Sequence, residues 1–390
     1  MRRFLSFLMI CMICMSCTAC AAPEEKGGVR LAALNVGKGD CLLLMIGDAA
    51  YLIDAGYDYT YNLLAEALRQ YGVTRLNGVF LSHCDKDHYG GLMPLACGGI
   101  AVDAWYAAAI YYDVKEGQHP MELAAAARGD TVQYLNAGDT LTLAEGAALR
   151  VVGPLTVNTT NENNNSLVFY VDTAEGSLLF TGDMKLEEEY ILLEAGVIEH
   201  ADLLKVPFHG DNTASSDSFV DRVSPAAALI CTSTAQEPDT PASSILKRYS
   251  RAGAEVYVTQ DYEWGVELTL SGGRVAVQAL TWDLPDYSGS VQAAIDAPQD
   301  LLTLRNTGSE DISLAGWIVL STKGEDCFAL PEDAVLPAGG TYTIGTKTTD
   351  TQVDLKLDIK RLWHKSKLDQ CQLYDASGRL TAVTDNGMPE

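Results

Sequence analysis

A short loop early in the chain combines side chains that bind metal ions. Within residues 81–92 (LSHCDKDHYGGL), two of the six histidines of the chain stand beside two aspartates, as His83, Asp85, Asp87 and His88. Imidazole nitrogen and carboxylate oxygen are ligands of Zn, Mn and Fe, and several of them on one loop can converge on one or two ions. A solvated, charged loop is the alternative, but solubility does not require ligands packed this closely. The loop therefore predicts a divalent-metal site.

The sequence around this loop supplies the elements that would position it. Apolar residues 79–81 indicate the end of a buried strand, and Gly90 with Gly91 permits a tight backbone path after the loop. Leucine spacing predicts a helix over residues 61–71 that covers one face of a sheet. Further strands are predicted from apolar runs at residues 29–36, 41–46 and 51–56.

The pattern His-x-Asp-x-Asp-His followed by Tyr-Gly-Gly-Leu resembles the metal loop of the metallo-β-lactamase superfamily. It is most similar to the branch related to the hydrolase domain of the DNA-uptake protein ComEC. The opening strands also resemble that branch at Asp40 and Asp54, although Asn35 and Lys38 replace two of its usual residues. A later strand end at Asp183 and another at His209 follow in the same order.

This resemblance implies a site with two divalent metal ions, Zn or Mn. It implies that one ion is held by His83, Asp85 and Asp183, and the other by Asp87, His88, Asp183 and His209. Asp183 would bridge the ions and act in catalysis together with Asp87. Two such ions activate water for attack on phosphorus or on a carbonyl carbon. Because Asp85 replaces a more usual histidine, we expect this site to accept Mn better than a histidine-rich site would.

Three further residues are candidates for substrate contacts. The resemblance implies that Asn165 and Ser166 face the site, as a weak ligand or a substrate contact. Lys205 either contacts an anionic substrate or is a solvated strand-end lysine. Phe208 stands where the branch has a first histidine before the ligand position of His209.

The other histidines and the cysteines point to no second site. His119, beside a proline, and His200 are both expected at the surface. Cys84 lies inside the metal loop but is expected to be a bystander. The spacing of the cysteines beyond residue 20 indicates neither a zinc ribbon nor a disulfide framework. They are expected to be small, mostly buried hydrophobic residues.

The first 20 residues indicate a targeting segment. A positive start at Arg2 and Arg3 precedes an apolar run, and small residues precede Cys20. This resembles a lipoprotein cleavage box with Cys20 lipidated, although plain secretory cleavage near Ala21 or Ala22 and an uncleaved anchor stay open. Residues 21–28 would be a linker. The chain is therefore expected on the outer face of the cell membrane, held at the membrane surface by a lipid, or secreted.

Two folded regions are expected after this segment. Residues 29–283 alternate strands with helices, and the resemblance implies an α/β fold, the four-layer αββα metallo-β-lactamase sandwich. Residues 284–290 contain proline and glycine and indicate a linker. Residues 291–390 carry short β runs between turn signals, and they resemble a lamin-tail domain, a small immunoglobulin-like β-sandwich.

A basic run in the last region departs from the acidic background. Five basic residues surround Trp363 there: Lys356, Lys360, Arg361, Lys365 and Lys367. They could hold a polyanion by charge and stacking, or they could be a solvated face with Trp363 in the core. The formal net charge of −25 argues against broad electrostatic capture of nucleic acid.

These observations favour an exported metal-dependent hydrolase, a phosphodiesterase or nuclease. Nucleic acid or another phosphodiester is the expected substrate, and no protein partner is inferred. A hydrolase of small esters or lactones is one alternative, because fold resemblance does not determine a substrate. A surface binding protein that has lost catalysis and works through the C-terminal domain is the other.

Overall fold

The computed structural model describes residues 28–112, 114, 118–282, 289–324 and 326–389 of the chain. The predicted targeting segment with Cys20 lies outside the described residues, as does most of each predicted linker. Among the residues that are described, none of the helices has the length and apolar character needed to cross a membrane.

Two mixed β-sheets form the centre of the larger region, and the described residues supply eight strands to one and seven to the other. The first has the order β17 (Arg274–Ala279), β16 (Gly265–Ser271), β1 (Val29–Leu34), β2 (Cys41–Ile46), β3 (Ala49–Ala55), β5 (Gly78–Leu81), β7 (Trp105–Ala108) and β8 (Val132–Leu135). The second has the order β15 (Glu255–Val258), β14 (Ala227–Ile230), β13 (Leu203–Lys205), β12 (Gly176–Phe180), β11 (Val168–Thr173), β10 (Ala147–Gly153) and β9 (Thr140–Ala144).

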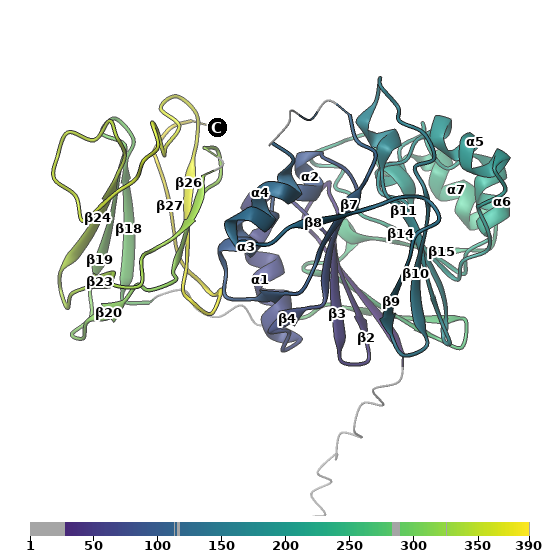
Figure 1. Ribbon diagram of the computed structural model, residues 1–390, viewed down its shortest axis with the longest axis horizontal. Coiled ribbons are helices and arrows are strands. Elements are labelled where there is room, and N and C mark those ends of the chain that lie inside the picture. Colours follow the sequence, from purple (N-terminus) through teal and green to yellow (C-terminus); the bar gives the residue numbers. More distant parts are fainter. Residues whose placement is uncertain (1–27, 113, 115–117, 283–288, 325, 390) are drawn as a thin grey trace, which may run out of the picture.

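Helices cover the outer face of each sheet, which makes four layers (Figure 1). On the first sheet lie α1 (Tyr61–Gln70), α2 (Lys86–Tyr89), α3 (Leu92–Cys97) and α4 (Pro120–Ala127). On the second lie α5 (Leu186–Glu194), α6 (Asp217–Val223) and α7 (Ser243–Arg251). Short elements complete this region: η1 (Asp58–Thr60), η2 (Glu162–Asn165), η3 (Pro207–Gly210), η4 (Thr259–Asp261), and the pair β4 (Arg75–Leu76) and β6 (Ala101–Val102).

Strand β2 shows why the sequences of the central strands are continuous apolar runs. All six of its residues are buried, because both faces of the sheet are covered. Leu42 and Leu44 belong to the core between the two sheets, whereas Leu43 and Met45 belong to the core beneath α1, α3 and α4. Alternate side chains of one strand therefore join two layers of the sandwich.

Parallel strands bring distant loops to one edge of the sandwich. In the first sheet β3 runs parallel to β5, and in the second β12, β13 and β14 run parallel to one another. The carboxyl ends of parallel strands meet at the same edge of a sheet. The loops after these strands therefore lie together, although β3 ends at Ala55 and β14 ends at Ile230.

The C-terminal region is a small β-sandwich. One of its sheets has the order β18 (Val291–Asp296), β19 (Leu301–Asn306), β24 (Thr341–Gly345) and β25 (Leu355–Lys356), and the other has the order β22 (Cys327–Ala329), β21 (Ile318–Ser321), β26 (Gln370–Tyr374) and β27 (Leu380–Asp385). A separate short pair, β20 (Ile312–Ser313) and β23 (Val335–Leu336), lies beside β19 and β24. Their core includes Trp363, which is fully buried.

The sandwich packs directly on the helices of the first sheet (Figure 1). Leu320 and Tyr374 belong to the same core as Leu95 of α3. The ring of Tyr374 meets that of Tyr61 edge-on at 5.1 Å between centroids. Gln372 also donates from Nε2 to the carbonyl oxygen of Tyr59 at 2.9 Å. The two regions therefore share a packed core.

The expected fold class is confirmed, from the αββα layers to the final β-sandwich. The predicted strands and the helix near residue 61 are present. The sequence analysis missed α2, α3, α4 and α6, because each is short and gives too few turns for a helical period to stand out.

Candidate metal centre

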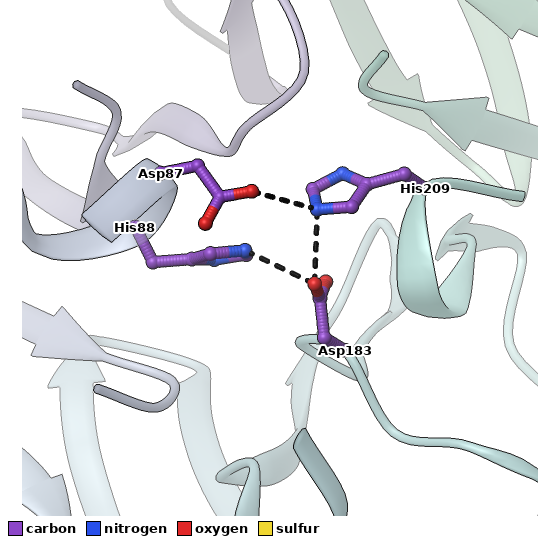
Figure 2. Close-up of side chains that lie close together, drawn as sticks. All are labelled: Asp87, His88, Asp183 and His209. Atoms are coloured by element: carbon purple, nitrogen blue, oxygen red, sulfur yellow. Dashed lines mark ion pairs between the residues drawn. The ribbon is translucent and has the colours of Figure 1, made fainter. Parts of the chain in front are cut away.

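Three strand-end loops bring four ligand-bearing side chains together. Asp87 and His88 come from α2 after β5, Asp183 follows β12, and His209 lies in η3 after β13. One ligand atom from each lies within 4.8 Å of the others, and all four residues are buried (Figure 2).

Asp183 is the centre of this group. Its Oδ2 lies 2.9 Å from Nε2 of His209 and 3.3 Å from Nε2 of His88. Nε2 of His209 also lies 3.4 Å from Oδ2 of Asp87. Both sheets of the sandwich therefore contribute to one cluster, with Asp183 placed to bridge (Figure 2).

His83 and Asp85 lie beside this cluster. Nε2 of His83 is 3.4 Å from Oδ2 of Asp85 and 3.9 Å from Oδ2 of Asp183. The Asp85 side chain is 44% exposed, whereas that of His83 is buried. The other five residues expected as ligands thus lie around Asp183, with Asp85 on the solvent side.

Each of the three loop histidines is oriented by a partner on its other nitrogen. Nδ1 of His88 lies 2.7 Å from Oδ2 of Asp54, and Nδ1 of His209 lies 2.7 Å from the carbonyl oxygen of Cys231. These acceptors require a proton on Nδ1, which leaves the lone pair on Nε2 and directs it into the cluster.

His83 follows the same arrangement through a serine. Nδ1 of His83 lies 3.0 Å from Oγ of Ser82, whose hydroxyl donates to Oδ2 of Asp54 at 2.7 Å. Because that hydroxyl hydrogen is used, Ser82 accepts from His83. Asp54 therefore positions two histidines, a role that its ordinary strand-end position in the sequence did not reveal.

The buried atoms of this cluster fit a bound cation. Within the described part of the chain, four nitrogen or oxygen atoms here are buried and lack a hydrogen-bond partner: Nε2 of His83, His88 and His209, and Oδ2 of Asp87. Buried polar atoms in proteins are normally satisfied. Imidazole nitrogen with carboxylate oxygen is a donor set for borderline divalent ions, so the residues present suit the divalent metal that the fold implies.

The electrostatics of the cluster are those of tightly paired opposite charges. Burial by itself lowers the pKa of His209, but the Asp183 carboxylate outweighs it and raises that pKa to about 9. Burial by itself also lowers the pKa of His88. The carboxylates of Asp183 and Asp54 outweigh burial and raise that pKa well above its usual value. Burial would raise the pKa of Asp183, but His209, His88 and Lys205 hold it well below the usual range. A divalent cation competes with protons for these ligand atoms.

Lys205 is buried inside the protein, so the predicted contact with a substrate is corrected. Its side chain is 1% exposed, and Nζ lies 2.6 Å from Oδ2 of Asp40. Nζ also donates to the carbonyl oxygen of Gly182 at 2.8 Å and lies 3.5 Å from Oδ1 of Asp183. The ammonium group is used in holding Asp40 and Asp183 in place.

Asn165 and Ser166 are also used within the protein. The Asn165 side chain accepts from the backbone N–H of Asn158 and donates to Glu162 and to the Asn158 carbonyl oxygen. Ser166 Oγ donates to the Asn163 carbonyl oxygen and accepts from the backbone N–H of Asp183 at 2.9 Å. Both side chains are buried next to the site, where they position the loop and Asp183.

Backbone geometry at the site requires particular residues. Gly91 approaches the carbonyl oxygen of Ala55 so closely that a Cβ there would lie 2.4 Å from it. His209 has a φ of 53°, in the left-handed region that few residues with side chains adopt. Such a conformation persists only where the surrounding structure enforces it, and it is frequent at functional sites.

The remaining histidines and Cys84 lie outside the cluster. His119 is 2% exposed, which corrects its expected surface position, and Nε2 contacts Sγ of Cys84 at 3.4 Å. Cys84 therefore points toward His119. His200 is exposed, as expected. Phe208, in place of a histidine, lies beneath Nζ of Lys185, which is 4.2 Å from the ring centroid.

Comparison with known proteins identifies both regions. Residues 34–234 match the model of the metallo-beta-lactamase superfamily, and residues 285–387 match that of the lamin tail domain. The chain is 26% identical over 249 residues to Recombination protein 2 of Haemophilus influenzae, covering 63% of this chain and 28% of that protein. It is 24% identical over 188 residues to ComE operon protein 3 of Bacillus subtilis, covering 48% of this chain and 24% of that protein.

A solved structure is similar to this chain at lower identity. The metallo-beta-lactamase fold protein YhfI of Bacillus subtilis is 14% identical and aligns with a TM-score of 0.40, over 65% of this chain and 100% of that one. The chain spans only about a quarter of the length of the two curated relatives named above. The chain belongs to the metallo-β-lactamase superfamily, resembles its ComEC-like branch of competence proteins, and carries a C-terminal lamin tail domain.

Proposed function

We propose that the chain is a metal-dependent hydrolase of phosphodiester bonds, with nucleic acid as its substrate class. The observation that carries this proposal is the set of buried, unsatisfied ligand atoms from the loops after β5 and β13, which lie around Asp183 of a third loop. Asp87, His88, Asp183 and His209 would hold one divalent ion, and His83 and Asp85 with Asp183 would hold a second. When bound, such ions lower the pKa of water toward ~7 and neutralise charge on the reacting oxygens.

The residues of the chain contribute orientation and charge. Asp54, Ser82 and the Cys231 carbonyl oxygen hold the histidines so that each presents Nε2. Nζ of Lys205, 3.5 Å from Oδ1 of Asp183, holds the Asp183 carboxylate in place. The site therefore needs no serine or cysteine nucleophile.

Two lysines beside the ligands favour an anionic substrate over a neutral ester or lactone. Nζ of Lys38 lies 3.3 Å from Oδ2 of Asp87, and its side chain is 24% exposed. Lys185 follows Asp183 by two residues and stacks on Phe208, next to His209. Positive charge at the mouth of a site attracts a phosphodiester. The name of one relative, Recombination protein 2, also favours nucleic acid.

The burial of Trp363 argues against the alternative of a surface binding protein. Trp363 is fully buried in the lamin tail domain, so it cannot stack on a base within the basic run. Lys356 and Lys365 each donate to a backbone carbonyl oxygen nearby.

The test is hydrolysis by the purified full chain after removal of metal and addition of Mn²⁺ or Zn²⁺. Substrates are labelled single-stranded DNA, a nitrophenyl phosphodiester and a nitrophenyl ester. We expect metal-dependent cleavage of both phosphodiesters, at least 100-fold slower in Asp183→Asn, because that change removes the central carboxylate. Asp239→Asn, at an exposed aspartate, is the matched control. Cleavage of the ester alone, or no cleavage by protein that holds metal, would overturn the proposal.

A further inference from the structure

Two cysteines from different domains meet at the domain interface. Cys97 is the last residue of α3 in the hydrolase domain, and Cys327 is the first residue of β22 in the lamin tail domain. Sγ of Cys97 donates to the backbone carbonyl oxygen of Cys327 at 3.9 Å, so the two residues are in direct contact. Both are free thiols and both are partly exposed.

Secondary structure holds each cysteine in place. Nη1 of Arg128 donates to the carbonyl oxygens of Ala96 and Gly98, the two residues that flank Cys97. Cys327 pairs with Leu320 across β21 and β22, and Leu320 lies in the core shared with α3. The contact between the two cysteines is therefore built into the packed interface.

We propose that Cys97 and Cys327 form a reversible disulfide bond that covalently joins the hydrolase domain to the lamin tail domain. The oxidant is a small-molecule disulfide. A thiolate of one cysteine attacks a sulfur of that disulfide, forms a mixed disulfide and releases one thiol. The second cysteine displaces the other half, so two protein thiols lose two electrons and two protons while the oxidant becomes two thiols.

The surroundings of the pair favour Cys97 as the attacking thiol. Contact with Cys327 is the largest cause that lowers the pKa of Cys97, and the nearby Arg128 guanidinium lowers it further against the effect of burial. The same contact raises the pKa of Cys327 well above its usual value. Cys327 also lines a cavity of about 340 Å³ between the two domains, which gives a small oxidant a route to Cys327, the residue that Cys97 contacts.

The other described cysteines are poor candidates for this reaction. Cys41, Cys231 and Cys371 are fully buried. Cys84 lines the same cavity as Cys327, but its Sγ lies against His119 and burial raises its pKa strongly. Cys84 is therefore the matched control.

The test treats the full chain with reduced or oxidised glutathione, alkylates free thiols and maps peptides without reduction. We expect a Cys97–Cys327 peptide pair in oxidised protein, lost on reduction and in Cys97→Ser or Cys327→Ser, and retained in Cys84→Ser. In Cys327→Ser, glutathione stays on Cys97, because the second thiol is missing. Alkylation of both cysteines after oxidation, a lasting glutathione adduct in the wild type, or linkage of either to another cysteine would overturn the proposal.

Thermal unfolding gives a second readout. Because the bond closes a very long loop, oxidised wild-type protein should unfold about 5 °C or more above reduced protein. The difference should vanish in Cys97→Ser. A lower unfolding temperature on oxidation would show that the bond strains the interface, and it would contradict the proposal that the packed arrangement already suits the bond.

Discussion

Asp54 determines which nitrogen of His88 reaches the cluster. It accepts from Nδ1 of His88, from the Ser82 hydroxyl and from the Ser82 backbone N–H, and it does so with a φ of 54°. Aspartate and asparagine tolerate that conformation better than most residues. The carboxylate charge can therefore be removed without changing the backbone preference.

Asp54→Asn should weaken binding of Mn²⁺ or Zn²⁺ by about 10- to 100-fold, the usual effect of removing a group that orients a metal-bound histidine. The amide nitrogen cannot accept from His88 or Ser82. Competition with a coloured chelator measures the affinity. Asp103→Asn, a partly exposed aspartate paired with Arg75, should leave it unchanged. Equal metal affinities of the wild type, Asp54→Asn and Asp103→Asn would show that Asp54 does not orient a metal-binding histidine.

Lys205 is the second residue whose role depends on burial. Lys205→Met leaves the buried carboxylate of Asp40 without its partner at 2.6 Å, so the free energy of unfolding should fall by about 3 kcal/mol. Chemical denaturation measures the loss, and Lys247→Met, at an exposed lysine, should show none. Adding Asp40→Asn to Lys205→Met should recover part of the loss, since the unpaired charge is then absent. A strictly additive double variant would disprove the pairing.

At the scale of elements, helix α5 carries two buried glutamates on the second sheet. Glu189 accepts from the backbone N–H groups of Ser215 and Ser216, which ties α5 to the segment before α6. Glu188 accepts a backbone bond from Leu155 at 3.2 Å. Burial raises the pKa of Glu188 to about 7, against the opposing effect of that hydrogen bond.

This shift gives α5 a defined pH dependence. The unfolded chain ionises Glu188 near its ordinary pKa of ~4.3, whereas the folded chain does so only near 7, so stability is lost as the pH rises between these values. Glu188→Gln removes that loss and should raise the free energy of unfolding by about 1–2 kcal/mol at pH 8, with little change at pH 4.5. Thermal unfolding at both values measures it, with Glu194→Gln as the exposed control. A gain of equal size at both pH values would assign the effect to something other than ionisation.

At the scale of the whole molecule, the lamin tail domain is a structural part of the hydrolase core. Leu320 is fully buried in a cluster with residues of α1, α3 and the first sheet. Helix α3 begins four residues after His88. The lamin tail domain therefore supports the helix that follows the metal loop.

Leu320→Ala should therefore lower the free energy of unfolding by about 2–4 kcal/mol, the usual range for a cavity at a buried leucine. Because the two regions share one core, calorimetry should show a single transition that moves as a unit. Leu123→Ala, at an exposed leucine, is the matched control. Two separate transitions, with only the later one shifted, would contradict the shared core.

What the sequence determined by itself was local. The ligands in the loop at residues 83–88 lie within six positions, so their convergence needed no knowledge of the fold. Strand and helix periods indicated the elements, whereas the αββα class and the lamin tail domain were predicted from the resemblance of the metal loop, of Asp183 and His209 and of the C-terminal turn motifs to known families. Short helices such as α2 and α3 gave no comparable signal.

The tertiary structure alone decided which polar residues are used inside the protein. Asp54 and His88 are 34 residues apart, and Lys205 reaches Asp40 from the other sheet, so no local pattern pairs them. The burial of Lys205, Asn165 and His119, which the sequence analysis placed against substrate or solvent, follows from packing between distant segments. The same holds for Cys97 and Cys327, which only the docking of two domains brings into contact. Such contacts depend on how layers stack, and composition and spacing along one segment carry no information about that.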